Sequence, residues 1–580
     1  MSDRNRTQQR RTGGGNRKNM VYTVPITDLS NLGYGVGRLP AAEGTPGKVV
    51  FVRGAVTGDT VEAAIIKETS GYLVGRLVRV TEPSPLREPE PFCTAPEACG
   101  GCVFRHLTYA AELESKHRRV QSAFRQAGLA DVTVLPPLST GQTAGYRNKG
   151  MYPVQSGKDG MQAGFFAAKS HRLIPCTACS LQPPAFADVV RTVCRFCDRE
   201  RIPAYDETTG SGILRHIYLR TTAAGNMMVC PVINANSLPG GHATEERLVD
   251  CLLAEHPQVV SILLNCNRKN TNVVLGESYR TLYGDEWIED TLCGLQFRLS
   301  AGSFYQVNHD GAELLYETAA RMAGLRGGES LWDLYCGAGT IGLSMLAPGR
   351  KVRPAQVTGV EIVPEAVACA EQNARLNAEA GRIPPDSARF FCADAGDAAS
   401  LFAAADQGRA PAPNIVVIDP PRKGTTPALI RELADRHIDR VVYVSCDPET
   451  LARDCALFRT CGYTVGQVQP VDMFPRTGHV ETVCQLVLRK PAVHINIDLD
   501  VEELVQDKRG TATYGQIKDY VLEHSGLKVS SLYIAQIKQK CGIIERENYN
   551  KPKSEHAKQP QCPPEKERAI KEALKHFGMI

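Results

Sequence analysis

The segment from Ile418 to Pro448 most constrains the fold, because two apolar runs in this part of the chain each end in a reactive residue. The runs Asn414–Ile418 and Arg440–Ser445 have the composition of buried parallel strands. Asp419 follows the first run and precedes two prolines, and Cys446 follows the second and precedes Asp-Pro. Because ligands bind beyond the carboxyl ends of parallel strands, we expect both side chains to face one crevice.

The composition is that of a folded multidomain protein of a reducing compartment. The chain has 580 residues, more than one hydrophobic core usually supports, so we expect three or more domains. No apolar run approaches the about 18 residues of a membrane span, and the polar, basic first residues exclude a secretory signal. Twenty cysteines therefore indicate free, catalytic or metal-bound thiols in the cytoplasm. The net charge of +4 makes any affinity for nucleic acid a matter of local patches.

The amino-terminal part contains a basic arm and a small β-barrel. Residues 1–19 are rich in arginine and glycine, which is typical of a disordered arm that is either solvated or in contact with phosphates. Residues 20–82 alternate short strands with glycine turns, and we place those turns at Gly33, Gly35, Gly37 and Gly71. The strand candidates are Val21–Ile26, Lys48–Val52, Asp59–Lys67 and Tyr72–Val80.

This spacing predicts an OB-like β-barrel, a fold that often binds nucleic acid. The run Gly-Tyr-Gly-Val-Gly at 33–37 and the run Val-Thr-Gly-Asp-Thr-Val-Glu at 56–62 resemble a TRAM domain, an RNA-binding barrel. A generic barrel used only for packing is the alternative. Four prolines between residues 83 and 91 then form a stiff linker.

Three cysteines, Cys93, Cys99 and Cys102, follow the linker within ten residues. Glycines between the last two favour a concave loop suited to an iron–sulfur cluster. Cys176 or Cys179 would supply the fourth thiolate. Zinc also suits four thiolates, but the first spacing of five residues does not fit a Cys-x2-Cys knuckle. Unliganded core cysteines are the remaining alternative.

Residues 83–295 are expected to form a central α+β domain that binds the cluster and RNA. Residues 104–128 have a helical pattern, and residues 130–290 alternate strands and helices. The segment Tyr146–Lys149 is predicted on a strand. Its aromatic ring and two cations suit RNA, although a paired surface strand would have the same composition.

Residues 296–490 have the pattern of a doubly wound α/β domain. The predicted strands are Ser330–Cys336, Gln356–Val363, Arg389–Ala393, Asn414–Ile418, Arg440–Ser445, Val465–Val471 and Thr482–Leu488. Helical stretches separate the first five, whereas the last two strands pair directly. This is the layout of a class I S-adenosylmethionine-dependent methyltransferase.

A glycine loop at Asp333–Thr340 follows the first of these strands and lets the backbone approach a ligand closely. Glu361 ends the second strand, where an acid accepts hydrogen bonds from ribose hydroxyls. Asp394, after the third strand, is expected beside an adenine.

Five short segments together resemble the signature set of the bacterial RNA uracil-C5 methyltransferases. They are Ser303–Asn308, Asp333–Thr340, Asp419–Gly424, Ser445–Pro448 and Gly478–Glu481. With the barrel and the cysteine loop, the resemblance covers roughly residues 20–490 and is strongest to the 23S ribosomal RNA branch, which has a TRAM barrel and a 4Fe–4S cluster.

The resemblance implies a set of site residues. Gln306, Tyr335, Glu361 and Asp419 would line the S-adenosylmethionine site, to which we add Thr340 and Asp394 from the glycine loop and the third strand. Cys179 would be the fourth cluster ligand, because Ser170-His171 and Cys179-Ser180-Leu181-Gln182 match the family pattern, while Cys176 is an extra thiol.

The chemistry explains why a thiol and a carboxylate are needed. Carbon 5 of uracil becomes nucleophilic when a thiolate adds to carbon 6, so Cys446 is the expected nucleophile, with a lowered pKa. Glu481 is the expected base that removes the proton from carbon 5. Asp419 would orient the cofactor or the uracil, Phe304 would stack on the base, and His479 is expected to be structural. The target uridine must be unpaired or flipped out.

We therefore expect a monomeric cytoplasmic enzyme that makes 5-methyluridine in 23S ribosomal RNA. Alternatives are a transfer-RNA uracil methyltransferase and a ribosome-associated RNA-binding protein without catalysis. An amino-methyltransferase would require an aromatic residue after Pro420-Pro421, where this chain has Arg422, and would not use Cys446.

Residues 491–580 lie beyond the resemblance. They predict helices at Thr513–Glu523, Ser530–Lys540 and Glu565–Phe577, the first two arranged like a helix-turn-helix with Lys538 and Lys540 on the second helix. The tail is expected either to add RNA affinity or to pack on the enzyme.

Overall fold

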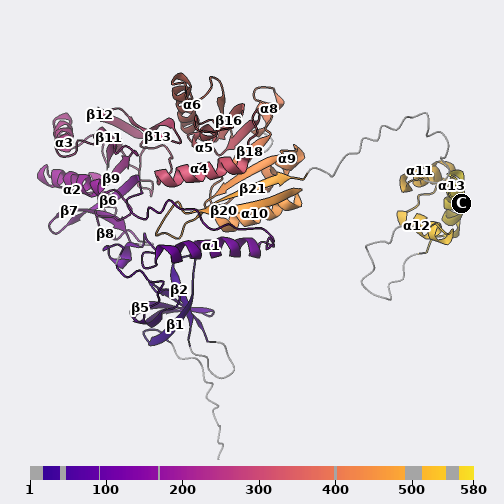
Figure 1. Ribbon diagram of the computed structural model, residues 1–580, viewed down its shortest axis with the longest axis horizontal. Helices are drawn as coiled ribbons and strands as arrows, with labels where there is room; N and C mark the ends of the chain where they lie inside the picture. The colour runs from indigo at the N-terminus through magenta and orange to yellow at the C-terminus, as the bar shows by residue number, and fades with distance from the viewer. Residues whose placement is uncertain are drawn as a thin grey trace, which may run out of the picture. The chain divides into compact units, whose positions relative to one another are not determined.

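The computed structural model divides the chain into two compact units, Met1–Arg489 and Lys490–Ile580 (Figure 1). The structure describes residues 17–39, 47–90, 92–167, 170–397, 401–489, 512–543 and 561–580. Most of the predicted basic arm lies outside the described residues.

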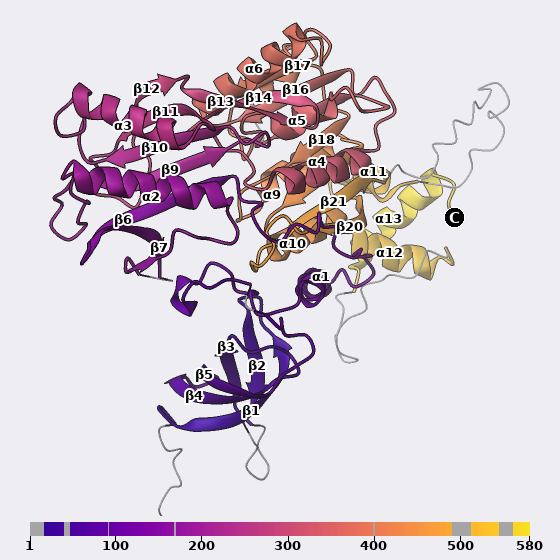
Figure 2. The ribbon, with the colours of Figure 1, turned by 60° about the vertical axis from the view of Figure 1, so that its left-hand side comes forward.

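A closed five-stranded barrel forms the amino-terminal part, in the strand order β1-β2-β3-β5-β4 (Figure 2). Its strands are β1 (Val21–Leu29), β2 (Tyr34–Arg38), β3 (Val49–Arg53), β4 (Thr60–Glu68) and β5 (Tyr72–Glu82). The prediction that Gly35 and Gly37 are turn residues is wrong, because both lie within β2. A Cβ at Gly37 would lie 2.5 Å from the carbonyl oxygen of Pro25, so these glycines let β1 and β2 approach closely.

The central part is a seven-stranded mixed sheet with the order β12-β11-β10-β9-β6-β7-β8. The strands are β6 (Lys149–Gly157), β7 (Gly160–Phe166), β8 (Leu173–Pro175), β9 (Leu214–Thr221), β10 (Met227–Ile233), β11 (Val259–Cys266) and β12 (Ser278–Gly284). Helices α2 (Pro184–Arg199) and α3 (His242–Glu255) pack on it over an apolar core. Only Lys149 of the segment Tyr146–Lys149 belongs to a strand, so that prediction was wrong for the first three residues.

Two further elements lie outside these sheets. A single 3-10 turn, η1 (Glu97–Cys99), lies in the cysteine loop, and the long helix α1 (Tyr109–Gln126) follows it. Helix α1 starts at 109 and not at 104, because the Thr108 side chain caps it by accepting from the backbone N–H of Ala111.

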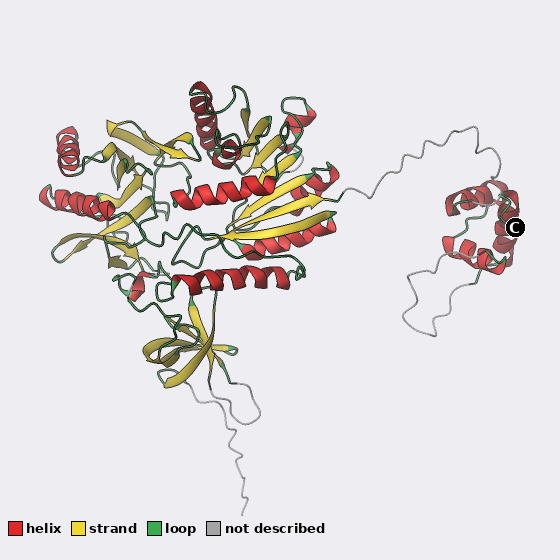
Figure 3. Ribbon diagram, viewed as in Figure 1, coloured by secondary structure: helices red, strands yellow, loops and turns green. Residues whose placement is uncertain are grey.

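Residues 287–489, which contain the predicted reactive residues and are called the catalytic part below, hold a second seven-stranded sheet with the order β17-β16-β15-β18-β19-β21-β20. Figure 3 draws the strands as yellow arrows and the helices in red. Its strands are β15 (Ser330–Leu334), β16 (Gln356–Glu361), β17 (Ala388–Cys392), β18 (Ile415–Ile418), β19 (Arg440–Ser445), β20 (Tyr463–Val471) and β21 (Glu481–Leu488). Only β21 is antiparallel to its neighbours β19 and β20. The order confirms the predicted class I methyltransferase architecture.

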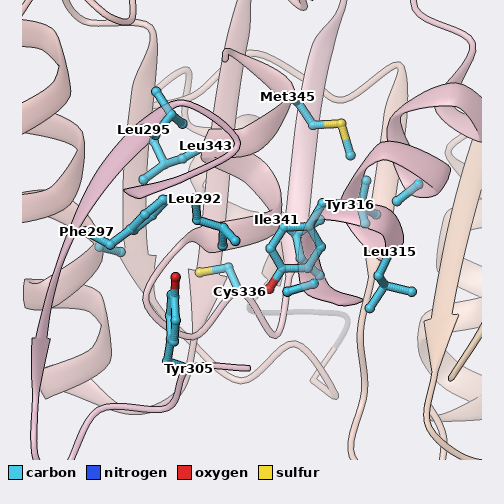
Figure 4. Packing of buried hydrophobic residues seen from close by; sticks show 14 of the residues in the cluster. Leu292, Leu295, Phe297, Tyr305, Leu315, Tyr316, Cys336, Ile341, Leu343 and Met345 are labelled. Carbon is cyan, nitrogen blue, oxygen red and sulfur yellow. The ribbon is translucent and has the colours of Figure 1, made fainter. Parts of the chain in front are cut away.

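Helices cover both faces of this sheet. Alternate residues of β18 and β19 point to opposite faces, so Val417 and Val442 enter one core, whereas Val416 and Val441 enter the other. The first core is closed by α4 (His309–Ala323), α5 (Thr340–Met345), α6 (Pro364–Glu379) and the hairpin of β13 (Trp287–Leu292) and β14 (Leu295–Ser300) (Figure 4). The second is closed by α1, α8 (Ala403–Asp406), α9 (Pro427–Asp435) and α10 (Pro448–Thr460).

The second unit contains α11 (Tyr514–Ser525), α12 (Ser531–Lys540) and α13 (Pro564–His576) around an apolar core of its own. All three predicted helices are confirmed. Lys538 is buried with its ammonium 4.6 Å from the Tyr514 ring, and Lys540 pairs with Glu567, so the fold engages both cations. Within the described parts of both units, every helix is too short or too polar to cross a membrane.

Candidate active site

The glycine loop after β15 forms one wall of the site. Tyr335 has a left-handed backbone (φ +63°), and Gly337 and Gly339 also have positive φ. The Gly337 N–H donates to Glu361 Oε2 over 3.1 Å, and Glu361 Oε1 accepts from the N–H groups of Ile362 and Val363. Space is open where a Cβ of Gly337 would stand. The loop is therefore folded around the carboxylate of Glu361 and leaves room for a ligand above its backbone.

Asp333 is a buried residue of this wall to which the sequence analysis gave no role. Its Oδ2 accepts from the Gly342 N–H over 2.7 Å, while Oδ1 has no partner among the described residues. Burial raises the pKa of Asp333 to about 7. Its position as the first residue of the Asp333–Thr340 motif was the available signal. A buried carboxylate oxygen without a donor, beside an open loop, fits a polar ligand that supplies one.

Two of the other predicted cofactor residues, Thr340 and Asp394, follow strands of the same sheet. Thr340 begins α5, and its hydroxyl lies 2.9 Å from that of Tyr316. Asp394 is exposed beyond β17 and accepts from the Gly396 N–H over 2.7 Å. Gln306 is buried, and its backbone carbonyl accepts a hydrogen bond from the side-chain amide of Asn148 over 3.0 Å. The central part therefore holds the Gln306 segment in place.

Cys446 and Glu481 meet at the ends of two neighbouring strands. In the antiparallel ladder of β19 and β21, Ser445 pairs with Thr482 at the end of β19, and continuing this register places the next residue, Cys446, opposite Glu481. The charge of Glu481 acts on the Cys446 thiol, which agrees with this placement. Side chains at directly opposed positions lie on the same face, within about 5.5 Å at Cβ. Asp419 follows β18, the other neighbour of β19. The topology thus gathers a thiol and two carboxyl groups that lie up to 62 residues apart (481 minus 419) in the sequence.

Burial and neighbouring charges shift the pKa values of these groups. Burial, with a smaller contribution from the charge of Asp419 and against the opposing charge of Arg422, raises the pKa of Glu481 to about 8. Burial also raises the pKa of Asp419 to about 7. Two carboxyl groups that are both hard to ionise near neutral pH are suited to proton transfer.

The prediction that the site lowers the pKa of Cys446 is wrong for the protein alone. Burial, together with the charges of Glu481 and Asp419, raises the pKa of the half-buried thiol to about 11. The guanidinium of Arg422 acts in the opposite direction but does not prevail. Protonation of Glu481 and Asp419, or a cation in the crevice, would shift the thiol towards the thiolate by removing or opposing these negative charges.

Arg422 and His479 form a polar border beside these residues. The Arg422 Nη2 lies 3.2 Å from the Nδ1 of His479, and burial together with Arg422 and Arg119 lowers the pKa of His479. From the sequence, Arg422 was only a residue that does not fit an amino-methyltransferase, and its electrostatic effect on Cys446 and Glu481 was not predicted. Phe304 exposes 66% of its surface to solvent. An aromatic ring with this exposure is accessible to a stacking partner.

The predicted cluster ligands lie in two loops that approach each other. The Ser180 hydroxyl donates to the carbonyl of Phe92 over 3.2 Å, which links the loop of Cys176 and Cys179 to that of Cys93. Burial and the neighbouring thiols Cys179, Cys93 and Cys99 raise the pKa of Cys102 to about 12. The same causes raise the pKa of Cys176 to about 11.

The five cysteines of the two loops are thus close enough that their thiolates would repel one another, and none of them forms a disulfide. They are Cys93, Cys99, Cys102, Cys176 and Cys179. In the described part of the chain, however, no set of three or more ligand residues is already arranged as a metal-binding group. Ligation of a 4Fe–4S cluster by Cys93, Cys99, Cys102 and Cys179 therefore stays a prediction. Four thiolates are suitable ligands for such a cluster.

Comparisons with known proteins identify similar sequences over most of the chain. The family model described as tRNA (Uracil-5-)-methyltransferase matches residues 108–490, and the TRAM domain model matches residues 17–78. An uncharacterized RNA methyltransferase of Halalkalibacterium halodurans is 38% identical over 475 residues, which cover 81% of this chain and 98% of that protein. One from Clostridium acetobutylicum is 36% identical over 474 residues, covering 80% of this chain and 97% of that protein.

Among solved structures, the Pyrococcus abyssi tRNA (uracil-54, C5)-methyltransferase in complex with S-adenosyl-L-homocysteine is similar to this chain. It is 25% identical, with a TM-score of 0.62, and the match covers 80% of this chain and 99% of that one.

Proposed function

Because the chain belongs to the tRNA (uracil-5-)-methyltransferase family and is an S-adenosylmethionine-dependent RNA methyltransferase, we propose that it methylates carbon 5 of uridine in 23S ribosomal RNA through a covalent adduct with Cys446. The observation that carries this proposal is the opposition of Cys446 and Glu481 across β19 and β21. A nucleophile and a base on one face of a strand pair can act on adjacent carbons of one pyrimidine.

In the proposed reaction the thiolate of Cys446 adds to carbon 6 and turns the base into an enolate. When bound, S-adenosylmethionine would supply the methyl group that carbon 5 takes, with cleavage of its methyl–sulfonium bond and release of S-adenosylhomocysteine. Glu481 removes the proton from carbon 5, the C5–C6 double bond re-forms, and the C6–S bond breaks to release Cys446 as a thiolate. Asp419 is close enough to both to hold the uracil edge or the cofactor, and Phe304 is free to stack on a neighbouring base.

The cofactor site proposed here uses the glycine loop and the strand ends. Glu361 would accept from the ribose hydroxyls, and the open backbone at Gly337 would lie against the ligand. Gln306, Tyr335, Thr340, Asp394 and Asp419 would complete the lining. The positive charge of the cofactor supports the thiolate of Cys446, whose pKa the carboxylates otherwise raise.

We also propose that Cys93, Cys99, Cys102 and Cys179 hold a 4Fe–4S cluster. The cluster would cross-link the two cysteine loops and remove the repulsion among their thiolates by binding them to iron. Iron and sulfide in the anaerobically purified protein, with broad absorbance near about 400 nm, would support this assignment. A colourless protein with stoichiometric zinc would overturn it.

Trapping with 5-fluorouridine RNA tests the proposed reaction, because fluorine on carbon 5 cannot be removed as a proton. Wild-type protein should form an adduct that survives denaturing electrophoresis, whereas C446A should form none. The C484A variant, which loses a buried thiol of β21, is the matched control and should behave as wild type. Equal behaviour of wild type and C446A would refute the covalent mechanism.

The choice of RNA is tested separately. Transcripts of 23S ribosomal RNA and of transfer RNA should be compared as methyl acceptors under single-turnover conditions at one salt concentration. The cysteine loop and the TRAM barrel support the ribosomal substrate, as the resemblance implies. Preferential methylation of transfer RNA would replace it with the family's other substrate class.

A further inference from the structure

The segment that leads into Glu481 is held almost entirely by residues that precede the catalytic part of the chain. Four carbonyl groups between residues 474 and 478 accept hydrogen bonds from donors between residues 104 and 146. They are Phe474 from Lys116 Nζ at 3.1 Å, Pro475 from the Tyr146 hydroxyl at 2.9 Å, Arg476 from the Phe104 N–H at 3.1 Å, and Gly478 from Arg119 Nη1 at 2.8 Å. The path of this segment thus depends on α1 and on the loop that carries the cysteines.

Arg476 joins the two sides of this contact. Its backbone is left-handed (φ +68°), a conformation unusual for arginine, and only 4% of the residue is exposed. Its N–H donates to Glu112 Oε1 over 2.7 Å, and its Nη1 donates to the carbonyl of Leu107 over 2.7 Å. The guanidinium lies 4.6 Å from the ring of Phe92, the residue before Cys93. A side chain of the base-bearing segment therefore inserts into the fold of the cysteine loop.

Gly478 shows how closely the segment is enclosed. A Cβ at this position would lie 2.7 Å from the carbonyl oxygen of Asn31 in the barrel and 3.4 Å from Val103 in the cysteine loop. By contrast, Cys446 is positioned within the catalytic part, where the Ser445 hydroxyl donates to the Asp447 carbonyl over 3.0 Å and Asp447 caps α10. Arg119 and Asn31 also reach this side, through hydrogen bonds to Glu449 of α10. The turn that carries Cys446 nevertheless has contacts of its own within the catalytic part, whereas the base segment depends on α1 and the cysteine loop.

We propose that the cysteine loop and α1 position the general base, with Arg476 as the positioning residue. This inference rests on the proposed function. It adds that the elements that position Glu481 act on the release of the product and not on the attachment of Cys446. Attachment of Cys446 and methyl transfer do not require a placed Glu481. Removal of the C5 proton, re-formation of the double bond and departure of the thiolate do. A displaced base therefore leaves the methylated RNA bonded to Cys446.

The test compares adduct formation with product release for natural uridine RNA and methyl-labelled S-adenosylmethionine, by rapid quenching of the full-length protein. R476K should form the adduct at the wild-type rate and release product about 10²-fold more slowly, the usual effect of a misplaced catalytic group. The labelled adduct should then accumulate. Y146F, which removes only the donor to Pro475, should slow release by about two- to tenfold, the effect of one hydrogen bond.

R459K is the matched control. Arg459 of α10 also bonds to the amino-terminal half of this unit, through hydrogen bonds of 2.9 and 3.0 Å to Asp131, but it lies outside the base segment 474–478. It should release product as wild type does. Slowing of attachment and release by the same factor in R476K, or unchanged release in both R476K and Y146F, would overturn the inference. If R476K does not fold, Y146F decides alone. Failure of wild type to form the 5-fluorouridine adduct would instead refute the proposed function.

Discussion

Among single residues, Glu481 should set the pH dependence of the last chemical step. Its raised pKa of about 8 keeps the carboxyl protonated at neutral pH, and the basic form gains population as the pH rises through 8. Product release from the trapped methylated adduct should therefore accelerate with pH across this range. E481Q should lose that dependence and release product on the order of 10²–10⁴-fold more slowly, as expected for loss of a general base. Single-turnover release between pH 6 and 9.5 measures both effects, and a pH-dependent rate in E481Q would contradict the assignment.

The same carboxyl should also reduce stability at high pH. A folded-state pKa of about 8, above the ordinary 4.5, means that stability present below pH 4.5 is lost as the pH rises through 8. Above that pH the fold holds a buried charge that costs on the order of several kcal/mol. E481Q, neutral throughout, should match the wild-type melting temperature near pH 5 and exceed it by several degrees, as an order of magnitude, near pH 9. Thermal melting monitored by circular dichroism at the two pH values is the measurement. A constant difference would show that the carboxyl is not strained in this way.

Phe304 should act on RNA binding and leave stability unchanged. Two thirds of its surface is exposed, so F304A removes little packing. Loss of a stacked base costs about 1–3 kcal/mol, which raises KM for RNA about 5- to 150-fold. Y283A, at an exposed aromatic residue of β12, is the control and should leave KM unchanged. A wild-type KM in F304A, measured by methyl transfer at fixed salt, would argue against a stacking role.

The reactive residues could be predicted from the sequence, but their electrostatics could not. Cys446 and Glu481 stand in recognisable motifs, yet their opposition depends on β21 running antiparallel to β19, which only the topology establishes. The expected low pKa of Cys446 presumed an electropositive site. In the fold, burial raises the pKa of the thiol most, the charges of Glu481, Asp419 and Asp447 add to this shift, and Arg422 opposes it. Burial and the approach of Glu481 and Asp419 depend on the strand register, which sequence spacing does not give.

At the scale of elements, strands that follow regular alternation were predictable, while those shaped by packing were not. All seven strands of the methyltransferase sheet were located to within a few residues. Strand β2 was missed because its glycines serve the close approach of β1, which local propensity does not encode. Tyr146 was predicted on a strand, but β6 begins only at Lys149. The Tyr146 hydroxyl donates to the carbonyl of Pro475, 329 residues away in the sequence, and local sequence does not predict a contact of this range.

The cysteine loops give a prediction at this scale about ligand identity. If Cys93, Cys99, Cys102 and Cys179 bind the cluster, C102A and C179A should lose most of the iron and sulfide after anaerobic reconstitution, whereas C176A should retain both. Cys176 is the matched control, because it lies in the same loop as Cys179 and is affected by the same neighbours. Colorimetric iron and sulfide per chain provide the measurement. Loss of the cluster in C176A alone would make Cys176 the fourth ligand.

For the whole molecule, the two compact units predict that catalysis does not depend on the tail. The family match ends at residue 490, and the described helices of residues 512–580 bury an apolar core of their own, which includes Ile517, Ile534 and Ile570. A protein ending at Arg489 should therefore keep the melting temperature of the catalytic unit and its single-turnover methylation rate within about twofold. The isolated segment 490–580 should give a helical circular dichroism spectrum and melt cooperatively, since α11, α12 and α13 pack on one another.

Loss of activity after truncation would show that the tail supports the enzyme. Equal activity with a marked rise in KM for RNA would assign the tail a role in holding the substrate, and comparison of KM for full-length and truncated protein at two salt concentrations separates these outcomes.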